Sequence, residues 1–231
     1  MSAANLVFNF VTGAGRTTRT TAISTAIIAG WTGRDKAAME KHIVELEALG
    51  VARPATTPIY YRVAAARLTT ASQIEVAGGE SSGEVEFVLA NVGGRLWLGV
   101  GSDHTDRKIE TLNVTASKQM CEKPVSADLW PFDEVSGHWD KLRLRSFILE
   151  EGKITPYQEG PVTTMQDPLD LIAGYSPGQG KLPEGSLMFC GTLAAKGGIR
   201  PAPRFMIELE DPVLGRKIAH AYDVLPLPVL G

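Results

Sequence analysis

The sequence has few cysteines, no excess of positive charge and no long apolar run. Its two cysteines, Cys121 and Cys190, are too few for a disulfide framework, and neither lies in a Cys-x-x-Cys pair or beside a histidine at metal-ligand spacing. We therefore predict that both thiols are reduced and structural. Lys and Arg total 23 against 26 Asp and Glu, a net charge of -3 without a basic block. This composition argues against a nucleic-acid partner.

The apolar opening of the chain lacks the features of a membrane or export segment. It runs through TTAISTAIIAGW, is interrupted by Arg16 and Arg19, and is too short to span a bilayer. It also lacks the early charged segment of a signal peptide. We therefore predict a cytoplasmic protein without a membrane partner.

Short apolar runs separated by turn residues predict a mainly β structure. The runs are punctuated by 24 Gly and 14 Pro, and they read PIYYRVA, SQIEVAG, EVEFVLA, RLWLGVG, KLRLRSFIL, SLMFCGT, RFMIELED and KIAHAYDV. One long helix is predicted over residues 35–49, where apolar residues recur at helical spacing before Gly50, and a second at DPLDLIAGY. No repeat or linker divides the chain. We predict an α+β, mainly β, single domain over residues 1–231, in which residues 1–25 form an N-terminal strand and turn.

Three acidic residues are candidates for a metal site. Glu84 and Glu86 in SGEVEFVLA share one face of a predicted strand, although glutamate is uncommon in strands. Asp103 ends the next apolar run, where a chain reversal would return it to their side. Three carboxylates suit a hard cation such as Mg²⁺, Mn²⁺ or Ca²⁺, which would offset their mutual repulsion. The alternative is a solvated edge strand that carries two unrelated glutamates.

A histidine and a glutamate on the long helix are candidates for acid-base chemistry. His42 and Glu45 stand three residues apart in KHIVE, so they are neighbours on one helix face. A carboxylate beside an imidazole fixes its tautomer and raises its basicity, which suits a general base. An ordinary surface pair is the alternative. His104, next to Asp103, is expected to point away from the carboxylates.

The order of the motifs resembles that of the fumarylacetoacetate hydrolase superfamily. The family's His-x-x-Glu pair, Pro-rich aromatic stretch, Glu-x-Glu, Asp, Lys and late Gly-Thr have counterparts from about Ile27 to the C-terminus. They appear in the segments AGWTGRDKAAMEKHIVE, PIYYRV, GEVEFVLA, GVGSDHTDRK, SKQMCEKP, YQEGPVTTM and LPEGSLMFCGT. The chain is also similar throughout to a bacterial family of unknown function that is a distant branch of this superfamily. The resemblance implies the fold of the family's C-terminal domain, a mixed β-roll or sandwich with a few helices.

The resemblance also implies roles for individual residues. It implies Glu84, Glu86 and Asp103 as ligands of Mg²⁺ or Mn²⁺, with Ca²⁺ as a substitute. The implied catalytic residues are His42, Glu45 and Lys118, and the implied substrate-binding residues are Tyr61, Arg62, Gly191 and Thr192. Where the family usually has a longer, helix-containing segment between Glu86 and Asp103, this chain has none. The resemblance further implies a homodimer.

The implied activity is that of a metal-dependent enzyme acting on a small keto or diketo carboxylate. Hydrolysis of a carbon-carbon bond through a metal-stabilised enolate, with His42 activating water, is the leading hypothesis. A decarboxylase, isomerase or hydratase acting on a 2-oxo acid needs the same enolate stabilisation and stays open. A non-catalytic domain that binds a small acid or a partner chain also stays open, because fold alone does not fix function.

Overall fold

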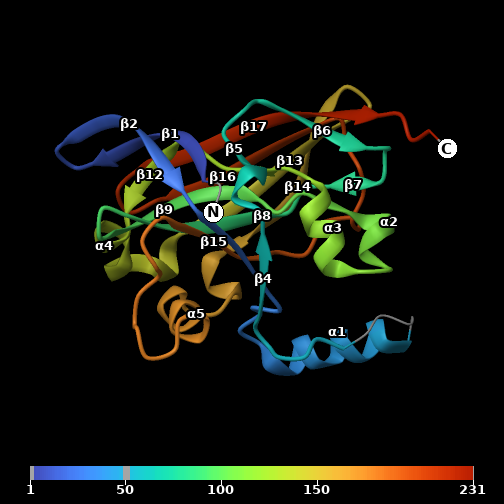
Figure 1. Ribbon diagram of the computed structural model, residues 1–231, viewed down its shortest axis with the longest axis horizontal. Coiled ribbons are helices and arrows are strands. Elements are labelled where there is room, and N and C mark those ends of the chain that lie inside the picture. Colours follow the sequence, from blue (N-terminus) through green and yellow to red (C-terminus); the bar gives the residue numbers. More distant parts are fainter. Residues whose placement is uncertain (1–2, 49–52, 231) are drawn as a thin grey trace.

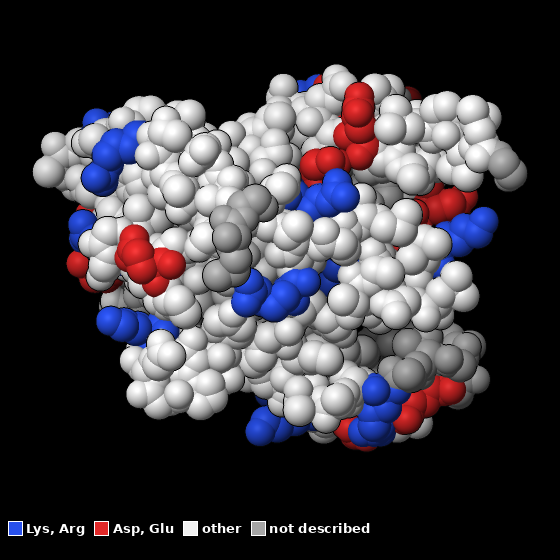
Figure 2. All heavy atoms as spheres, in the orientation of Figure 1, with Lys and Arg blue, Asp and Glu red and all other residues white. Residues whose placement is uncertain are grey.

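The computed structural model of the protein describes residues 3–48 and 53–230, apart from the side chains of His42, Glu45, Leu46 and Ala48. The fold is built on two β-sheets that lie one above the other, with helices around their margins (Figure 1). Among the described helices, none has the length and apolar character needed to cross a membrane. On the face seen in Figure 2, the described charged residues of both signs are scattered and form no continuous basic stripe.

The larger sheet has eight strands, and it carries the candidate carboxylates near its middle. All neighbours in this sheet are antiparallel except the pairs β1 with β12 and β15 with β3. Its strands, in spatial order, are β2 (Gly15–Ile23), β1 (Ala4–Thr12), β12 (Asp128–Pro131), β9 (Arg95–Ser102), β8 (Val85–Val92), β15 (Ser186–Thr192), β3 (Thr25–Gly30) and β4 (Ile59–Val63).

The smaller sheet has five strands and covers one face of the first. Its strands, in spatial order, are β14 (Lys153–Pro161), β13 (Arg143–Glu150), β16 (Arg204–Asp211), β17 (Arg216–Leu227) and β6 (Gln73–Ala77). Two short pairs complete the strands: β10 (Thr105–Asp106) with β7 (Ser81–Ser82), and β11 (Lys123–Pro124) with β5 (Leu68–Thr69). Strands β7 and β10 flank Glu84 and Asp103 in the sequence, and β11 follows Lys118 closely.

Strand β8 is buried on both faces, which explains its nearly continuous apolar run. Phe87 packs into the core between the two sheets, where Leu209 of β16 contributes from the other side. Val88, on the opposite face, packs into a second core with Phe8 of β1. Full burial of such a side chain stabilises the fold by about 1.5–3 kcal/mol. The glutamate at position 86 is therefore held in one of the most buried strands of the protein.

The two helices predicted from the sequence are confirmed. Helix α1 (Lys36–Ala48) begins at Asp35, whose carboxylate accepts hydrogen bonds from the N–H groups of Ala37 and Ala38, both at 3.0 Å. Helix α5 (Pro168–Tyr175) begins in the same way at Asp167. The remaining helical segments are short: η1 (Ala65–Arg67), α2 (Arg107–Glu110), α3 (Val114–Met120), α4 (Phe132–Val135), η2 (Ser136–Lys141) and η3 (Val162–Thr164).

All eight apolar runs form strands, but the N-terminal region differs from the prediction. In place of one strand and a turn, its described part forms a hairpin of the two strands β1 and β2. Strand β2 reads GRTTRTTAI and is exposed along most of its length. No alternation of apolar and polar residues marks it, so its only signal is the preference of threonine for strands.

Candidate metal centre and active site

A tight hairpin brings the three candidate carboxylates together. Strands β8 and β9 are joined by Gly93 and Gly94, whose φ values of 65° and 72° suit a two-residue turn. The register that this turn sets pairs Val85 with Ser102, so Glu84 lies opposite Asp103. The N–H of Asp103 donates to the carbonyl of Glu84 at 3.0 Å. The chain reversal predicted from the sequence is confirmed.

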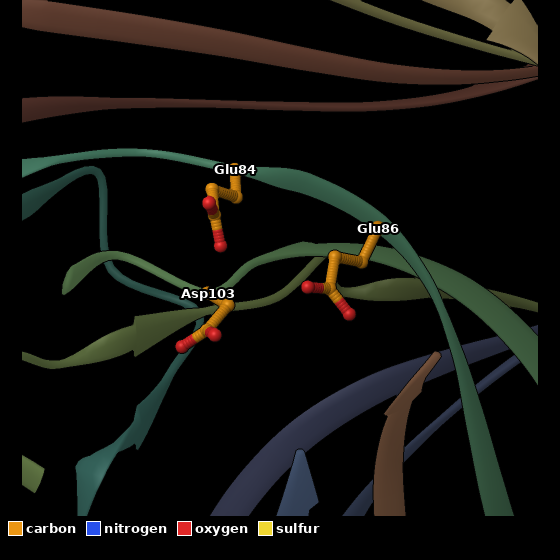
Figure 3. Close-up of side chains that lie close together, drawn as sticks. All are labelled: Glu84, Glu86 and Asp103. Atoms are coloured by element: carbon orange, nitrogen blue, oxygen red, sulfur yellow. The ribbon is translucent and has the colours of Figure 1, made fainter. Parts of the chain in front are cut away.

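The carboxylates of Glu84, Glu86 and Asp103 point toward one another from neighbouring strands (Figure 3). One oxygen from each lies within 4.8 Å of the other two. Asp103 is fully buried, Glu86 is 2% exposed and Glu84 is partly exposed. Within the described part of the chain, no other group of three acidic, histidine or cysteine side chains converges in this way. The alternative of a solvated edge strand is wrong, since β8 is a central strand.

Glu86 is buried and makes no ion pair with a lysine or arginine among the described residues. Burial raises the pKa of its carboxyl group well above the usual range, and the charges of Asp103 and Glu84 raise it further. One oxygen accepts a hydrogen bond from the N–H of Gly191 at 2.6 Å. The ionised form of Glu86 is therefore disfavoured while no cation is bound.

Asp103 remains ionised because each of its oxygens meets a lysine. The Lys118 ammonium lies 2.5 Å from Oδ2, and the Lys123 ammonium lies 3.1 Å from Oδ1. Burial alone would raise the pKa of Asp103, but the two lysines outweigh it and hold the pKa well below the usual range. Burial likewise opposes the charge of Lys118, yet Asp103 and Glu84 raise the pKa of this lysine.

Glu84 is paired with Arg107, which follows β10. The guanidinium lies 3.1 Å from Glu84 and 2.8 Å from Glu110, and it donates to the hydroxyl of Ser82 at 2.7 Å. Together, Arg107, Lys118 and Lys123 place three basic side chains around the three carboxylates. These contacts offset part of the repulsion between the carboxylates.

His104 supports the backbone of the cluster without facing its carboxylates. Its ring lies 2.9 Å from the Ser81 hydroxyl and 3.1 Å from the Tyr222 hydroxyl, and burial lowers its pKa to about 3. Tyr222 donates to the hydroxyl of Ser102, which accepts a hydrogen bond from the N–H of Glu84. The expectation that His104 points elsewhere is confirmed.

The histidine and glutamate predicted as a dyad belong to helix α1, as expected. His42 and Glu45 lie three residues apart in it, but both side chains lie outside the described part of the structure. Figure 1 shows α1 along the lower margin of the molecule, away from the two sheets. Their role as a dyad stays a prediction.

The predicted substrate-binding residues are placed on two sides of the site. Tyr61 lies near Lys118, whose ammonium is 5.8 Å from the centre of the tyrosine ring. Arg62 projects from the other face of β4, and its guanidinium donates to the Tyr175 hydroxyl at 3.1 Å. The structure therefore brings Tyr61 beside the cluster and holds Arg62 against helix α5.

The Gly-Thr pair adjoins Glu86, and its polar groups already have partners. The N–H of Gly191 donates to Glu86, and its φ of +100° suits glycine. A side chain at position 191 would also collide with Thr32, 1.7 Å from its hydroxyl oxygen. The Thr192 hydroxyl donates to the Val85 carbonyl and accepts a hydrogen bond from the Gln158 amide, both at 2.8 Å.

Two cationic residues of the site were not assigned from the sequence. Lys123 follows Lys118 by five residues in SKQMCEKP, and Arg107 follows Asp103 by four in SDHTDR. Neither spacing indicates that the side chain is buried against a carboxylate. The available signal is a charge balance, because three buried carboxylates require cations nearby.

Solved structures with this fold include proteins of the fumarylacetoacetate hydrolase family. A yeast protein of that family, ynq8, matches with a TM-score of 0.62 and 17% identity over 90% of this chain and 95% of its own. A Burkholderia cenocepacia protein described as a candidate fumarylpyruvate hydrolase matches with a TM-score of 0.64 and 21% identity, over 99% of this chain and 98% of its own. A 2-keto-3-deoxy-D-arabinonate dehydratase, solved with magnesium and 2,5-dioxopentanoate, matches with a TM-score of 0.62 and 16% identity, over 92% of this chain and 77% of its own.

These likenesses confirm the fold that the motif order implies, a mainly β structure like that of the family's C-terminal domain. No curated protein sequence matches the chain. A sequence family does match over residues 29–222, which is most of the chain. The chain therefore belongs to the family described as "Protein of unknown function (DUF2848)", and it has the fold of fumarylacetoacetate hydrolase family proteins.

Proposed function

We propose that this protein is a divalent-metal-dependent hydrolase that cleaves a carbon-carbon bond of a small keto or diketo carboxylate, such as an acylpyruvate. The observation that carries the proposal is the convergence of Glu84, Glu86 and Asp103 within 4.8 Å, beside Lys118. The fold supports it, since solved proteins with this fold include hydrolase-family members and a dehydratase.

The donor atoms of the cluster fit a hard cation. All three are carboxylate oxygens, which favours Mg²⁺ or Mn²⁺, with Ca²⁺ as a substitute, over the softer ions that prefer nitrogen and sulfur. Glu84, Glu86 and Asp103 would hold the ion. When bound, it would supply Lewis acidity that stabilises negative charge on a substrate oxygen. The dehydratase with this fold, solved with magnesium and a dioxo acid, supports the same pairing of ion and substrate class.

The residues of the chain would then divide the work of hydrolysis. His42, oriented by Glu45, would take a proton from water, so that the hydroxide adds to the substrate carbonyl. Lys118 would stabilise the oxyanion that forms there. As that oxyanion collapses to a carboxylic acid, the carbon-carbon bond breaks and the electron pair leaves as an enolate; the acid then gives its proton to the solvent. The proton on His42 would return to the enolate carbon.

Substrate binding would use the remaining residues named from the resemblance. Tyr61 would form a wall beside Lys118, and Gly191 with Thr192 would lie at the Glu86 end of the substrate. Arg62 would have to turn away from its contact with Tyr175 to meet a carboxylate, which it would then bind as a fork, where an ammonium would act as a point charge. A homodimer and a cytoplasmic location remain predictions from the sequence.

A second candidate function is a water-loss, isomerisation or decarboxylation reaction on the same substrate class. The dehydratase among the proteins of this fold favours water loss, isomerisation or decarboxylation of a 2-oxo acid. These reactions also need a stabilised enolate, but they need no attacking water. Proton exchange separates them from a non-catalytic binding domain: an enzyme of either kind should exchange the C3 protons of a 2-oxo acid with deuterium once Mg²⁺ or Mn²⁺ is added.

The proposal is tested with a panel of acylpyruvates and other diketo acids in the presence of Mg²⁺ or Mn²⁺. Loss of the ultraviolet absorbance of the enolised diketone, with two carboxylic acids as products, is the expected result. His42→Ala should lower turnover by roughly 10²- to 10⁴-fold, the usual contribution of a general base, and should keep proton exchange. Exchange without hydrolysis in the wild type would favour the second reaction, and neither activity would favour a binding domain.

A further inference from the structure

Asp103 is held in an unusual way for a proposed metal ligand, because a separate ammonium group lies on each of its oxygens. Lys118 contacts Oδ2 at 2.5 Å and Lys123 contacts Oδ1 at 3.1 Å. Both sides of the carboxylate are therefore already occupied by positive charge. A divalent cation that binds Asp103 has to enter against at least one of these lysines.

The two lysines differ in how firmly they are held. The Lys123 side chain is fully buried, and its ammonium also donates to the backbone carbonyl of His104. Its strand, β11, pairs with β5. Val125, the first residue after β11, forms a bridge with Gly101 of β9. Lys123 is thus fixed in both backbone and side chain. If its ammonium moved away, the buried His104 carbonyl and the Asp103 carboxylate would both lose a hydrogen-bond donor.

The Lys118 side chain is less firmly held than that of Lys123, and it lies next to other groups that can accept its ammonium. It lies in the last turn of α3, a helix of seven residues, and its side chain is 8% exposed. Its ammonium makes one hydrogen bond, to Asp103, among those of the described residues, and it lies beside the half-buried ring of Tyr61. Glu110 of the neighbouring helix α2 attracts it as well. An ammonium released from Asp103 would therefore stay at the edge of the site.

We propose that Lys118 is the exchangeable partner of Asp103 and Lys123 the permanent one, so that a divalent cation enters the cluster by replacing the Lys118 ammonium. The inference rests on the proposed metal site and says how that site is loaded. Lys123 is then a positioning residue that keeps Oδ1 occupied and presents Oδ2 to the ion. The displaced ammonium of Lys118 turns toward Tyr61 and becomes available to the substrate, so cation occupancy and the readiness of Lys118 are coupled.

The test compares cation affinity in three lysine variants of the full chain by calorimetry with Mn²⁺ alone. Lys118→Met removes the competitor, and we expect affinity to rise by about tenfold or more, because a unit charge a few ångströms from an ion opposes its binding strongly. Lys123→Met removes a basic group from the same carboxylate but also removes the contact that holds Oδ1 in place, so its gain in affinity should be clearly smaller than that of Lys118→Met. Lys108→Met, an exposed lysine of α2, is the matched control for net charge and should change affinity less than about twofold.

The outcomes separate this inference from the metal site itself. Equal affinity gains in Lys118→Met and Lys123→Met would overturn the exchange, since either lysine would then act only through its charge. Binding in the wild type with no gain in Lys118→Met would overturn the exchange and leave the metal site standing. No binding in the wild type or in Lys118→Met would overturn both.

A second measurement keeps the inference testable if Lys123→Met does not fold. A crystal structure of the wild type with Mn²⁺ should show the Lys118 ammonium beyond hydrogen-bond distance of Asp103 and Lys123 still in contact with Oδ1. A bound ion with the Lys118 contact retained would overturn the exchange.

Discussion

Two aspartates of this protein pair with cations at similar distances in very different surroundings. Asp103 is fully buried and meets Lys118 and Lys123 at 2.5 and 3.1 Å. Asp223, on the five-stranded sheet, meets Arg204 at 3.0 Å, but the two side chains are 51% and 43% exposed. Water screens the exposed pair, whereas a buried charge that loses its partner has no solvent to replace it. Burial, and not distance, therefore determines how much the loss of one partner costs in folding stability.

The buried pairs also explain how three carboxylates share one small volume. The protein places Arg107 against Glu84 and two lysines against Asp103, while burial raises the pKa of Glu86 and so disfavours its charge. These contacts offset repulsion among the carboxylates, so we expect the metal-free protein to be folded. Under the proposed exchange, an external cation takes the place of one of these internal cations.

The largest effect is expected on removing the buried aspartate. Asp103→Ala leaves two buried ammonium groups without their partner, and breaking a buried ion pair in this way costs about 3–5 kcal/mol. Urea unfolding in metal-free buffer measures the change. A loss below about 1 kcal/mol, the size of a typical substitution, would show that the buried and exposed pairs do not differ as argued.

The second effect is a loss of metal affinity with little loss of stability. Glu86→Gln keeps the shape of the side chain and removes a charge that burial already disfavours, so the free energy of unfolding should change by less than about 1 kcal/mol. Mg²⁺ or Mn²⁺ binding should weaken by more than about 100-fold, because outer-shell partners of ligands alone are worth roughly 10- to 100-fold. Unchanged calorimetric affinity would remove Glu86 from the metal site.

Much of the fold could be predicted from the sequence because its strands carry regular signals. Apolar runs bounded by Gly and Pro located β8, β9 and β13, and helical spacing located α1. Strand β2 was not predicted because nearly all of it is solvent-exposed. Helix α3 was not predicted because seven residues are too few to establish a helical period.

The candidate site was predicted in part. The carboxylates could be found because Glu84 and Glu86 contradict the apolar character of their strand, and a contradiction of that kind needs an explanation. Their partners could not, because Lys123 lies on a two-residue strand and Arg107 at a helix start, where no periodicity indicates burial. The convergence of α3, β11 and the β8–β9 hairpin is a tertiary feature that no local pattern encodes.

A third aspartate, Asp211, is as buried as Asp103 but is paired mainly by backbone N–H groups and a histidine, and it predicts a dependence on pH. Asp211 is buried, which opposes its charge, but N–H groups of Val213 and Leu214 at 3.1 Å and His138 at 3.0 Å lower its pKa. A carboxyl group with a lowered pKa stabilises the folded state fully above its unfolded pKa of about 3.9 and loses that contribution as pH falls toward the folded value.

We therefore expect the stability of the wild type to decline below about pH 4, and Asp211→Asn to decline less steeply over the same range. Thermal unfolding between pH 6 and pH 2.5 provides the measurement, with Asp223→Asn as the exposed control. Parallel curves for wild type and Asp211→Asn would show that this carboxyl group does not contribute to acid unfolding.

The smallest effect is expected at the exposed pair that began the comparison. Arg204 and Asp223 face each other across β16 and β17, so a double-mutant cycle with Arg204→Ala and Asp223→Ala isolates their interaction. Exposed pairs of this kind contribute about 0.2–1 kcal/mol, and the coupling should shrink in 1 M salt, where the screening length falls to about 3 Å. A salt-independent coupling above about 2 kcal/mol would mean that the guanidinium of Arg204 is held much as the buried lysines are, and that exposure is a poor guide to the strength of ion pairs in this protein.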